Sequence, residues 1–224
     1  MQVIVVASQK GGAGKTTLAG HLAVEAERTG AGPVVLIDTD RQGSLTAWWN
    51  ERESETPHFL GTTFPRLMSD LQTLAAEGVK LVFIDTPPAI TLAIRDVISY
   101  ATIVLLPTRP SPHDLRAVGA TVELAEEAKK PVVFVLNGAP RHAPITADAA
   151  IALSQYGTVA PVTVHHRIDY VTSMIDGRTV MELDPNGVSA KEIGDLWAYV
   201  AKRLEKLRDR GVFARLGKLV GSKD

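Results

Sequence analysis

The sequence lacks cysteine altogether, and aromatic residues make up only 5% of its 224 residues. Without cysteine the chain can form no disulfide, no thiolate metal site and no cysteine-ligated iron–sulfur cluster. No stretch approaches the ~20 apolar residues of a membrane-spanning helix, and none resembles a signal peptide, so we expect a soluble, cytoplasmic protein without stable membrane insertion. A formal net charge of −1 argues against a generally basic nucleic-acid binder, so any such binding must come from a local patch.

Short apolar runs alternate with helical patterns along the chain, and turn residues bound each run. The runs that predict parallel strands are 3–6, 34–37, 81–84, 101–106 and 131–136. This alternation predicts an α/β fold with a doubly wound, mostly parallel sheet and helices on both faces. The length fits one domain, which we place at residues 1–210, followed by a basic C-terminal tail or short helix at 211–224.

The most informative stretch is Ser-Gln-Lys-Gly-Gly-Ala-Gly-Lys-Thr-Thr at residues 8–17, directly after the first apolar run. A buried strand that ends in a glycine-rich turn and opens a helix aims backbone N–H groups at one anion. Lys15 can reach the β- and γ-phosphates of a nucleotide, and the Thr16 hydroxyl can bind Mg²⁺. The residues expected to contact the nucleotide are Lys10, Gly11, Gly12, Ala13, Gly14, Lys15, Thr16 and Thr17. The loop therefore predicts binding of a nucleoside triphosphate.

One feature of the loop departs from the standard phosphate loop. Gln9 stands where a glycine is usual, and a second lysine, Lys10, follows it. The form Lys-Gly-Gly-x-Gly-Lys-Thr resembles the deviant Walker A loop of the ParA/MinD family of ATPases, which have the P-loop NTPase fold. The resemblance implies that Lys10 reaches across a dimer to the nucleotide of the partner, and that Lys10 and Lys15 both serve catalysis. A glycine-rich turn without a ligand is the alternative, and it leaves the two lysines and Thr16 unexplained.

Three aspartates follow predicted strands at the sheet edge that carries the loop. Asp38 and Asp40 come after the second strand, and Asp85 comes after the run 81–84. Asp85 has the Walker B pattern, in which a carboxylate holds Mg²⁺. The resemblance implies that Asp40 positions the attacking water, and that Thr16, Asp38 and Asp85 form the metal site. The alternative for Asp38 and Asp40 is a pair of caps on the next helix.

Two further segments resemble small, plasmid-type ParA proteins. Asn137, at the end of the run 131–136, resembles the residue that reads adenine, since an amide both donates and accepts hydrogen bonds. The stretch 180–187, which contains Pro185, resembles the segment that closes the adenine pocket. The proline-rich segment 107–115 resembles a segment that lies at the subunit interface in ParF-like partition ATPases; the alternative is a rigid connection.

The candidate DNA contacts are basic residues in the last third of the chain. The resemblance implies a contact for Arg167, before a helix that leads to the Gly-x-x-Val containing Arg178. Residues 202–224 hold eight basic and three acidic side chains, among them Arg203 and Lys206. This segment is either a patch for the DNA backbone or a solvated tail.

The last long helix has a predicted start and a predicted buried face. Ser189-Ala190-Lys191-Glu192 has the pattern of a capping box, with the serine and the glutamate satisfying each other's backbone N–H groups. An apolar stripe then predicts packing on the sheet; it consists of Ile193, Leu196, Trp197, Val200, Leu204 and Leu207.

The sequence as a whole indicates a ParA-type, Mg²⁺-dependent ATPase with slow basal turnover, most like the short ParF-like partition ATPases. We expect it to dimerise on ATP, to bind DNA non-specifically at the nucleoid and to segregate or position a plasmid, chromosome or protein-complex cargo. A ParB-like or other small adaptor or centromere-binding protein would stimulate hydrolysis. One alternative is a MinD-like membrane-surface switch that uses residues 212–220, which have the spacing of an interfacial helix. Another is a metabolic enzyme on the same fold, against which Lys10 argues.

Overall fold

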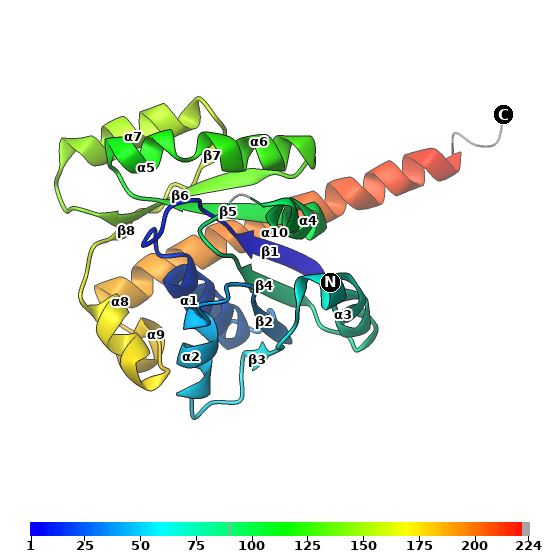
Figure 1. Ribbon diagram of the computed structural model, residues 1–224, viewed down its shortest axis with the longest axis horizontal. Helices are drawn as coiled ribbons and strands as arrows, with labels where there is room; N and C mark the ends of the chain where they lie inside the picture. The colour runs from blue at the N-terminus through cyan, green and yellow to red at the C-terminus, as the bar shows by residue number, and fades with distance from the viewer. Residues whose placement is uncertain (90, 221–224) are drawn as a thin grey trace.

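The computed structural model describes residues 1–89 and 91–220, and the side chains of this part up to residue 209. Its centre is an eight-stranded sheet in the order β3-β2-β4-β1-β5-β6-β7, with β8 paired to β6 (Figure 1). All pairings are parallel, which confirms the predicted sheet. The strands are β1 (Gln2–Val6), β2 (Val34–Asp38), β3 (His58–Phe59), β4 (Leu81–Asp85), β5 (Ile103–Thr108), β6 (Val132–Ala139), β7 (Thr158–Val159) and β8 (Val164–His165).

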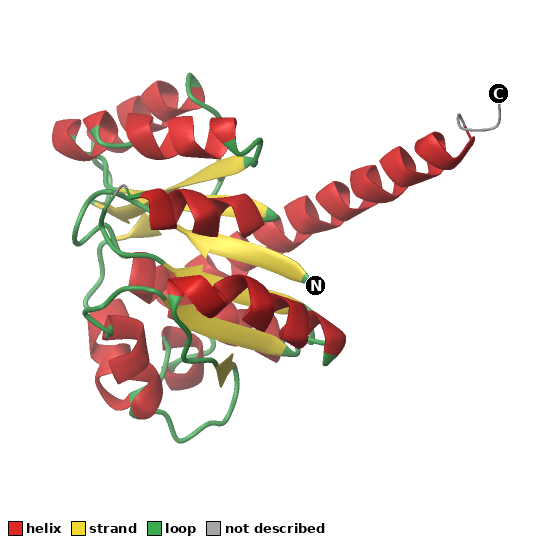
Figure 2. Cartoon of the chain, turned by 45° about the vertical axis from the view of Figure 1, so that its right-hand side comes forward, coloured by secondary structure: helices red, strands yellow, loops and turns green. Residues whose placement is uncertain are grey.

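Helices cover both faces of the sheet, as the alternation of elements predicts (Figure 2). The helices are α1 (Lys15–Arg28), α2 (Ser44–Asn50), α3 (Phe64–Ala76), α4 (Leu92–Tyr100), α5 (Pro112–Arg116), α6 (Gly119–Glu127), α7 (Pro144–Ser154), α8 (Asp169–Thr172), the 3₁₀ helix η1 (Ser173–Asp176), α9 (Val180–Leu183) and α10 (Val188–Val220). One core joins the sheet to α1, α2, α9 and α10, and the other joins it to α3, α4, α6 and α7.

The first strand shows why the central strands read as continuous apolar runs. Ile4 and Val6 pack into the core under α1, whereas Val3 and Val5 pack into the opposite core. Successive side chains of a strand point to opposite faces, so a strand covered on both sides needs apolar residues at every position. Because β1 lies between β4 and β5, the loops that follow these three strands meet at one edge of the sheet.

The start of α10 differs from the sequence prediction. The helix begins at Val188, and the Ser189 hydroxyl donates to the Asp169 carboxylate instead of capping the helix. Glu192 likewise turns away from the helix end and pairs with Arg167. The predicted capping box is therefore wrong. The structure instead has a capping box at the start of α9, formed by Thr179 and Glu182.

The body of α10 packs as the apolar stripe predicts. Five of its six residues are buried in the core beside α1, and Leu207 packs against them partly buried. The helix continues past residue 210 to Val220, and its last part projects away from the sheet (Figures 1 and 2). The side chains on which the membrane-surface alternative depends, at 212–220, lie outside the described ones. Within the described part, no helix combines the length and the apolar character needed to cross a membrane.

Candidate functional site

The loop between β1 and α1 has the backbone of an anion-binding turn. Gly12 and Gly14 take left-handed conformations, with φ of 73° and 90°, which favour glycine. A Cβ at Gly14 would also collide with the side-chain amide of Asn137. Lys15 begins α1 directly after this turn, so the first N–H groups of the helix, which lack intrahelical partners, point toward the loop.

The two lysines of the loop lie in different environments. Lys15 is 7% exposed, and burial lowers the pKa of its ammonium group, while the Asp85 and Asp40 carboxylates raise that pKa. Lys10 is exposed at the surface of the loop. Lys15 is therefore positioned to act inside its own subunit, and Lys10 is accessible to a second molecule.

Asp85 and Thr16 form the centre of the site. The Thr16 hydroxyl donates to Oδ2 of Asp85 over 2.5 Å, and Asp85 is 1% exposed. Its other oxygen, Oδ1, is buried and has no hydrogen-bond partner among the described residues. Burial raises the pKa of this carboxyl to about 7; Asp38 also raises it, whereas the Thr16 hydroxyl and Lys15 lower it. A buried carboxylate oxygen that lacks a partner needs a ligand, because leaving it unpaired costs free energy.

The donor set fits Mg²⁺, which prefers oxygen ligands and usually keeps several waters and phosphate oxygens around it. Thr16 and Asp85 would hold the ion. Among the described residues, no group of three His, Cys, Asp or Glu side chains could hold a metal. The remaining ligands therefore have to come from water and from a bound nucleotide.

Asp38 and Asp40 lie next to this centre. Asp38 supports helix α2, and the charge of Asp40 acts on Lys15. Asp38 pairs in register with Asp85 on the neighbouring strand, and its Oδ1 accepts from the backbone N–H of Asp40 over 2.9 Å. Its Oδ2 accepts from both the backbone N–H and the hydroxyl of Thr46, so Asp38 holds the first turn of α2. Asp38 thus supports α2 although the N-cap residue of that helix is Gly43, and its place in the metal site stays a prediction. Asp40 uses one oxygen to accept from the N–H of Gln42, and its charge acts on Lys15.

Of the two residues predicted to contact adenine, Asn137 touches the phosphate loop and Pro185 lies in an exposed turn. Asn137 lies inside β6 rather than after it, and its amide donates to the carbonyl of Ala13 over 2.7 Å. This contact supports the loop from the sheet. Pro185 is exposed in the turn between α9 and α10. Among the described residues, no hydrogen bond links that turn to the loop.

Arg167 is held by an ion pair rather than presented to solvent. Its Nη2 lies 2.8 Å from Oε1 of Glu192, and its side chain is 14% exposed. The same carboxylate accepts from the ring and backbone nitrogens of His165 and from the Tyr170 hydroxyl. The hydrogen bond and charge of Glu192 raise the pKa of Arg167, so the guanidinium stays charged and paired.

The other three candidate DNA contacts lie on other segments: Arg178 precedes α9, and Arg203 and Lys206 are on α10. Arg178 pairs with Asp176 over 2.5 Å and keeps a side chain 53% exposed. Arg203 donates to the Thr158 hydroxyl over 3.4 Å, and Lys206 is exposed. Since a helix rises about 1.5 Å per residue, Arg203 lies about 22 Å along α10 from its first residue.

His21 is a site residue that the sequence pattern did not reveal, because it looks like one polar residue within an amphipathic helix. Its side chain is fully buried and lies 2.8 Å from the carbonyl of Thr17 through Nδ1. Its Nε2 lies 3.3 Å from the backbone N–H of Val180 and 3.4 Å from the Ser173 hydroxyl. A carbonyl only accepts and a backbone N–H only donates, so the proton is on Nδ1. His21 thus ties the helix that carries the loop to α9.

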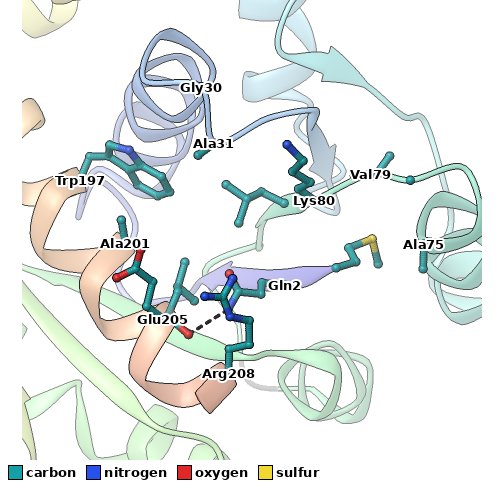
Figure 3. Close-up of a pocket in the computed structure, with 14 residues that line it drawn as sticks. Gln2, Gly30, Ala31, Ala75, Val79, Lys80, Trp197, Ala201, Glu205 and Arg208 are labelled. Atoms are coloured by element: carbon teal, nitrogen blue, oxygen red, sulfur yellow. Dashed lines mark hydrogen bonds between the residues drawn. The ribbon is translucent and has the colours of Figure 1, made fainter. Parts of the chain in front are cut away.

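The structure also contains a cavity of about 550 Å³ at the opposite edge of the sheet (Figure 3). Gln2, Lys80, Trp197 and Arg208 are among the residues that line it. Gln2 begins β1 and Lys80 precedes β4, so this cavity faces the amino ends of the strands. Ligands of parallel α/β sheets bind at the carboxyl ends. The cavity is therefore distinct from the site around the loop.

Two solved structures have the same fold at low sequence identity. Apo McdA from Cyanthece superimposes with a TM-score of 0.76 at 18% identity, covering 89% of this chain and 99% of that one. The septum site-determining protein MinD from Pyrococcus horikoshii, complexed with Mg-ADP, gives a TM-score of 0.74 at 16% identity over 92% of this chain and 98% of that one. These likenesses show the P-loop NTPase fold.

Sequence comparison identifies relatives of this chain and the family to which it belongs. Maintenance of carboxysome distribution protein A from Halothiobacillus neapolitanus is 31% identical over 205 residues, which are 84% of this chain and 91% of that protein. Protein ParA from Rhizobium radiobacter is 31% identical over 134 residues, 59% of this chain and 60% of that protein. The family model for the CobQ/CobB/MinD/ParA nucleotide binding domain matches residues 4–216. This match spans nearly the whole chain, and the chain therefore belongs to the CobQ/CobB/MinD/ParA nucleotide-binding family.

Proposed function

We propose that this protein is a Mg²⁺-dependent ATPase that dimerises on ATP and uses slow hydrolysis as a switch. The observation that carries the proposal is the hydrogen bond from Thr16 to the buried Asp85 at the phosphate loop, where the second carboxylate oxygen has no partner among the described residues. Mg²⁺ bound there with ATP would neutralise charge on the β- and γ-phosphates.

The residues around this pair suit a hydrolytic role. Lys15 is buried where it can bind phosphate oxygens, and Asp40 is close enough for its charge to act on that lysine. Asp40 would accept a hydrogen bond from the attacking water and hold it in line with the γ-phosphate. Lys10 is exposed and would complete the site only when a second subunit docks. Basal hydrolysis should be slow for this reason.

The test compares ATP binding, turnover and molecular mass for the wild type, Lys15→Ala and Asp40→Ala. Lys15→Ala should not bind ATP, because the phosphates lose their buried cation. Asp40→Ala should bind ATP, hydrolyse it very slowly and accumulate as a dimer. An Asp40→Ala protein that stays monomeric with ATP, or that turns over at the wild-type rate, would contradict the proposal. Rapid turnover by the wild type alone would favour a metabolic enzyme on this fold.

The ATP-bound dimer would bind DNA without sequence preference and position a cargo along it, with an adaptor protein that stimulates hydrolysis. Similarity to a carboxysome distribution protein and to a ParA protein supports a protein assembly, a plasmid or a chromosome as the cargo. Arg178, Arg203 and Lys206 are the accessible or partly accessible cations for the DNA backbone. Arg167 would contact DNA only if Glu192 released it.

A salt titration of DNA binding, with a non-hydrolysed ATP analogue and with ADP, tests the proposal that the ATP-bound dimer binds DNA without sequence preference. Arg203→Ala/Lys206→Ala should weaken binding to unrelated sequences about equally and flatten the salt dependence. The control, Arg66→Ala/Lys130→Ala, removes the same charge elsewhere. Strong binding by the ADP form, or preference for one sequence, would refute the DNA proposal. Binding of anionic liposomes instead of DNA would favour the membrane-surface switch.

A further inference from the structure

Arg109 lies across the phosphate loop, although no loop motif includes it. It directly follows β5, which pairs with β1 on one side and β6 on the other, so it emerges at the edge of the sheet that carries the loop. Its guanidinium covers Gly12, where a Cβ would lie 3.7 Å from Nη2. Its stem covers Gly138, where a Cβ would lie 3.5 Å from Nε and 3.7 Å from Cγ. The Arg109 side chain therefore packs against two glycines with left-handed backbone.

The surroundings of Arg109 leave its charge uncompensated. Arg109 is exposed, and in the described part of the chain no carboxylate lies within 4.0 Å of its guanidinium. The loop on which it rests carries Lys10 and Lys15 and leads into α1, whose first N–H groups bear a partial positive charge. A guanidinium with no carboxylate partner, resting on an anion-binding turn, is available to an anion held by that turn.

The charge of the site points in the same direction. Asp38 and Asp85 end β2 and β4, and Asp40 follows β2, on one side of the loop. Lys15 is the only buried cation there among the described residues. A nucleotide polyanion adds further negative charge, even with Mg²⁺. A guanidinium on the β5 side supplies a compensating charge, and its planar fork suits two phosphate oxygens at once.

We propose that Arg109 is a nucleotide-binding residue whose guanidinium binds phosphate oxygens of the nucleotide held by its own subunit's loop. This inference rests on the proposed function, since it requires that the loop bind a nucleotide. It adds a cation from β5 to the two loop lysines. The glycines at 12 and 138 lie in contact with this side chain, and their left-handed backbone, with φ of 73° and 61°, is what favours glycine at both positions.

The test measures the affinity of the whole protein for Mg·ATP and Mg·ADP by calorimetry, at protein concentrations below those at which dimers form. Arg109→Gln keeps a stem over Gly138 and removes the charge; it should bind nucleotide about tenfold to a hundredfold more weakly, since hydrogen bonds to charged groups are worth about 1.5–3 kcal/mol. Arg109→Lys should recover part of the loss. Arg208→Ala, which removes an exposed cation at the opposite edge of the sheet, should bind as the wild type does.

The outcomes separate this inference from the proposed function. A wild type that binds neither nucleotide would overturn both. A wild type that binds ATP while Arg109→Gln binds both nucleotides within about twofold of it would overturn the assignment of Arg109 alone, because such a loss is below one charged hydrogen bond. A weaker affinity for ATP with unchanged affinity for ADP would place the contact at the γ-phosphate, and weakening of both would place it at the α- or β-phosphate. A loss seen only where dimers form would put Arg109 against the partner's nucleotide and overturn binding within its own subunit.

Discussion

Replacing His21 should change how the stability of the protein depends on pH. Burial lowers the pKa of His21 from 6.5 to about 4, an effect to which the Arg52 charge adds, while the Thr17 carbonyl and Glu182 oppose it. The unfolded chain therefore binds a proton at this position between pH 6.5 and about 4, and the folded protein does not. The stability from neutral His21 is present above pH 6.5 and is lost as the pH falls toward 4.

The pKa values set the size of this effect. One pKa unit is worth about 1.4 kcal/mol, so the full difference is about 3 kcal/mol, of which about 2 kcal/mol is lost by about pH 5. His21→Gln keeps a donor for the Thr17 carbonyl and an acceptor for Val180, but it does not titrate. The stability of the wild type relative to the variant should therefore fall by about 3 kcal/mol as the pH is lowered from about 7 to about 4.

The assay is urea unfolding at several pH values, with the free energy of unfolding compared between wild type and variant at each one. Carboxylates contribute equally to both proteins and cancel in the difference. His58→Gln removes an exposed histidine and should keep the pH dependence of the wild type. Wild-type and His21→Gln curves that stay parallel from about pH 7 to about pH 4.5 would refute the assignment of His21 as a buried neutral residue.

Three further changes test other parts of the structure. Arg52→Ala should cost about 2–3 kcal/mol and lower Tm by roughly 8 °C, because the part-exposed Glu182 carboxylate loses its charged partner and keeps only the donors of Thr179; the Arg52 side chain is 2% exposed. Arg66→Ala, in a pair whose arginine is 71% exposed, should cost at most about 1 kcal/mol in the same thermal melts. Gly14→Ala should lose nucleotide binding while staying folded by circular dichroism, because a Cβ there meets the Asn137 amide in a left-handed backbone. Asp85→Asn should lose the Mg²⁺ dependence of ATP affinity in calorimetry, and an unchanged response to Mg²⁺ would contradict the metal site.

The sequence by itself determined the sheet, the phosphate loop and the three carboxylates beside it. These features are local: an apolar run of strand length, then a turn or an aspartate, repeated along the chain. The carboxyl ends of parallel strands share one edge, so the order of such units already places Asp85 near Thr16. The loop lysines needed no tertiary information either, because their spacing from the glycines defines the motif.

The tertiary structure alone decided the partners of Asn137, His21 and Glu192. Asn137 supports Ala13, which lies 124 positions away, and His21 meets Val180 across 159 positions. Glu192 fits a local capping pattern, yet it pairs with Arg167, which the topology brings to the start of α10. A local pattern contains no information on such pairings, because a polar group takes the partner that gives it a hydrogen bond when both become buried. The packing of distant segments, and not the phosphate-loop motif, therefore determines which side chains contact the loop and the helix that follows it.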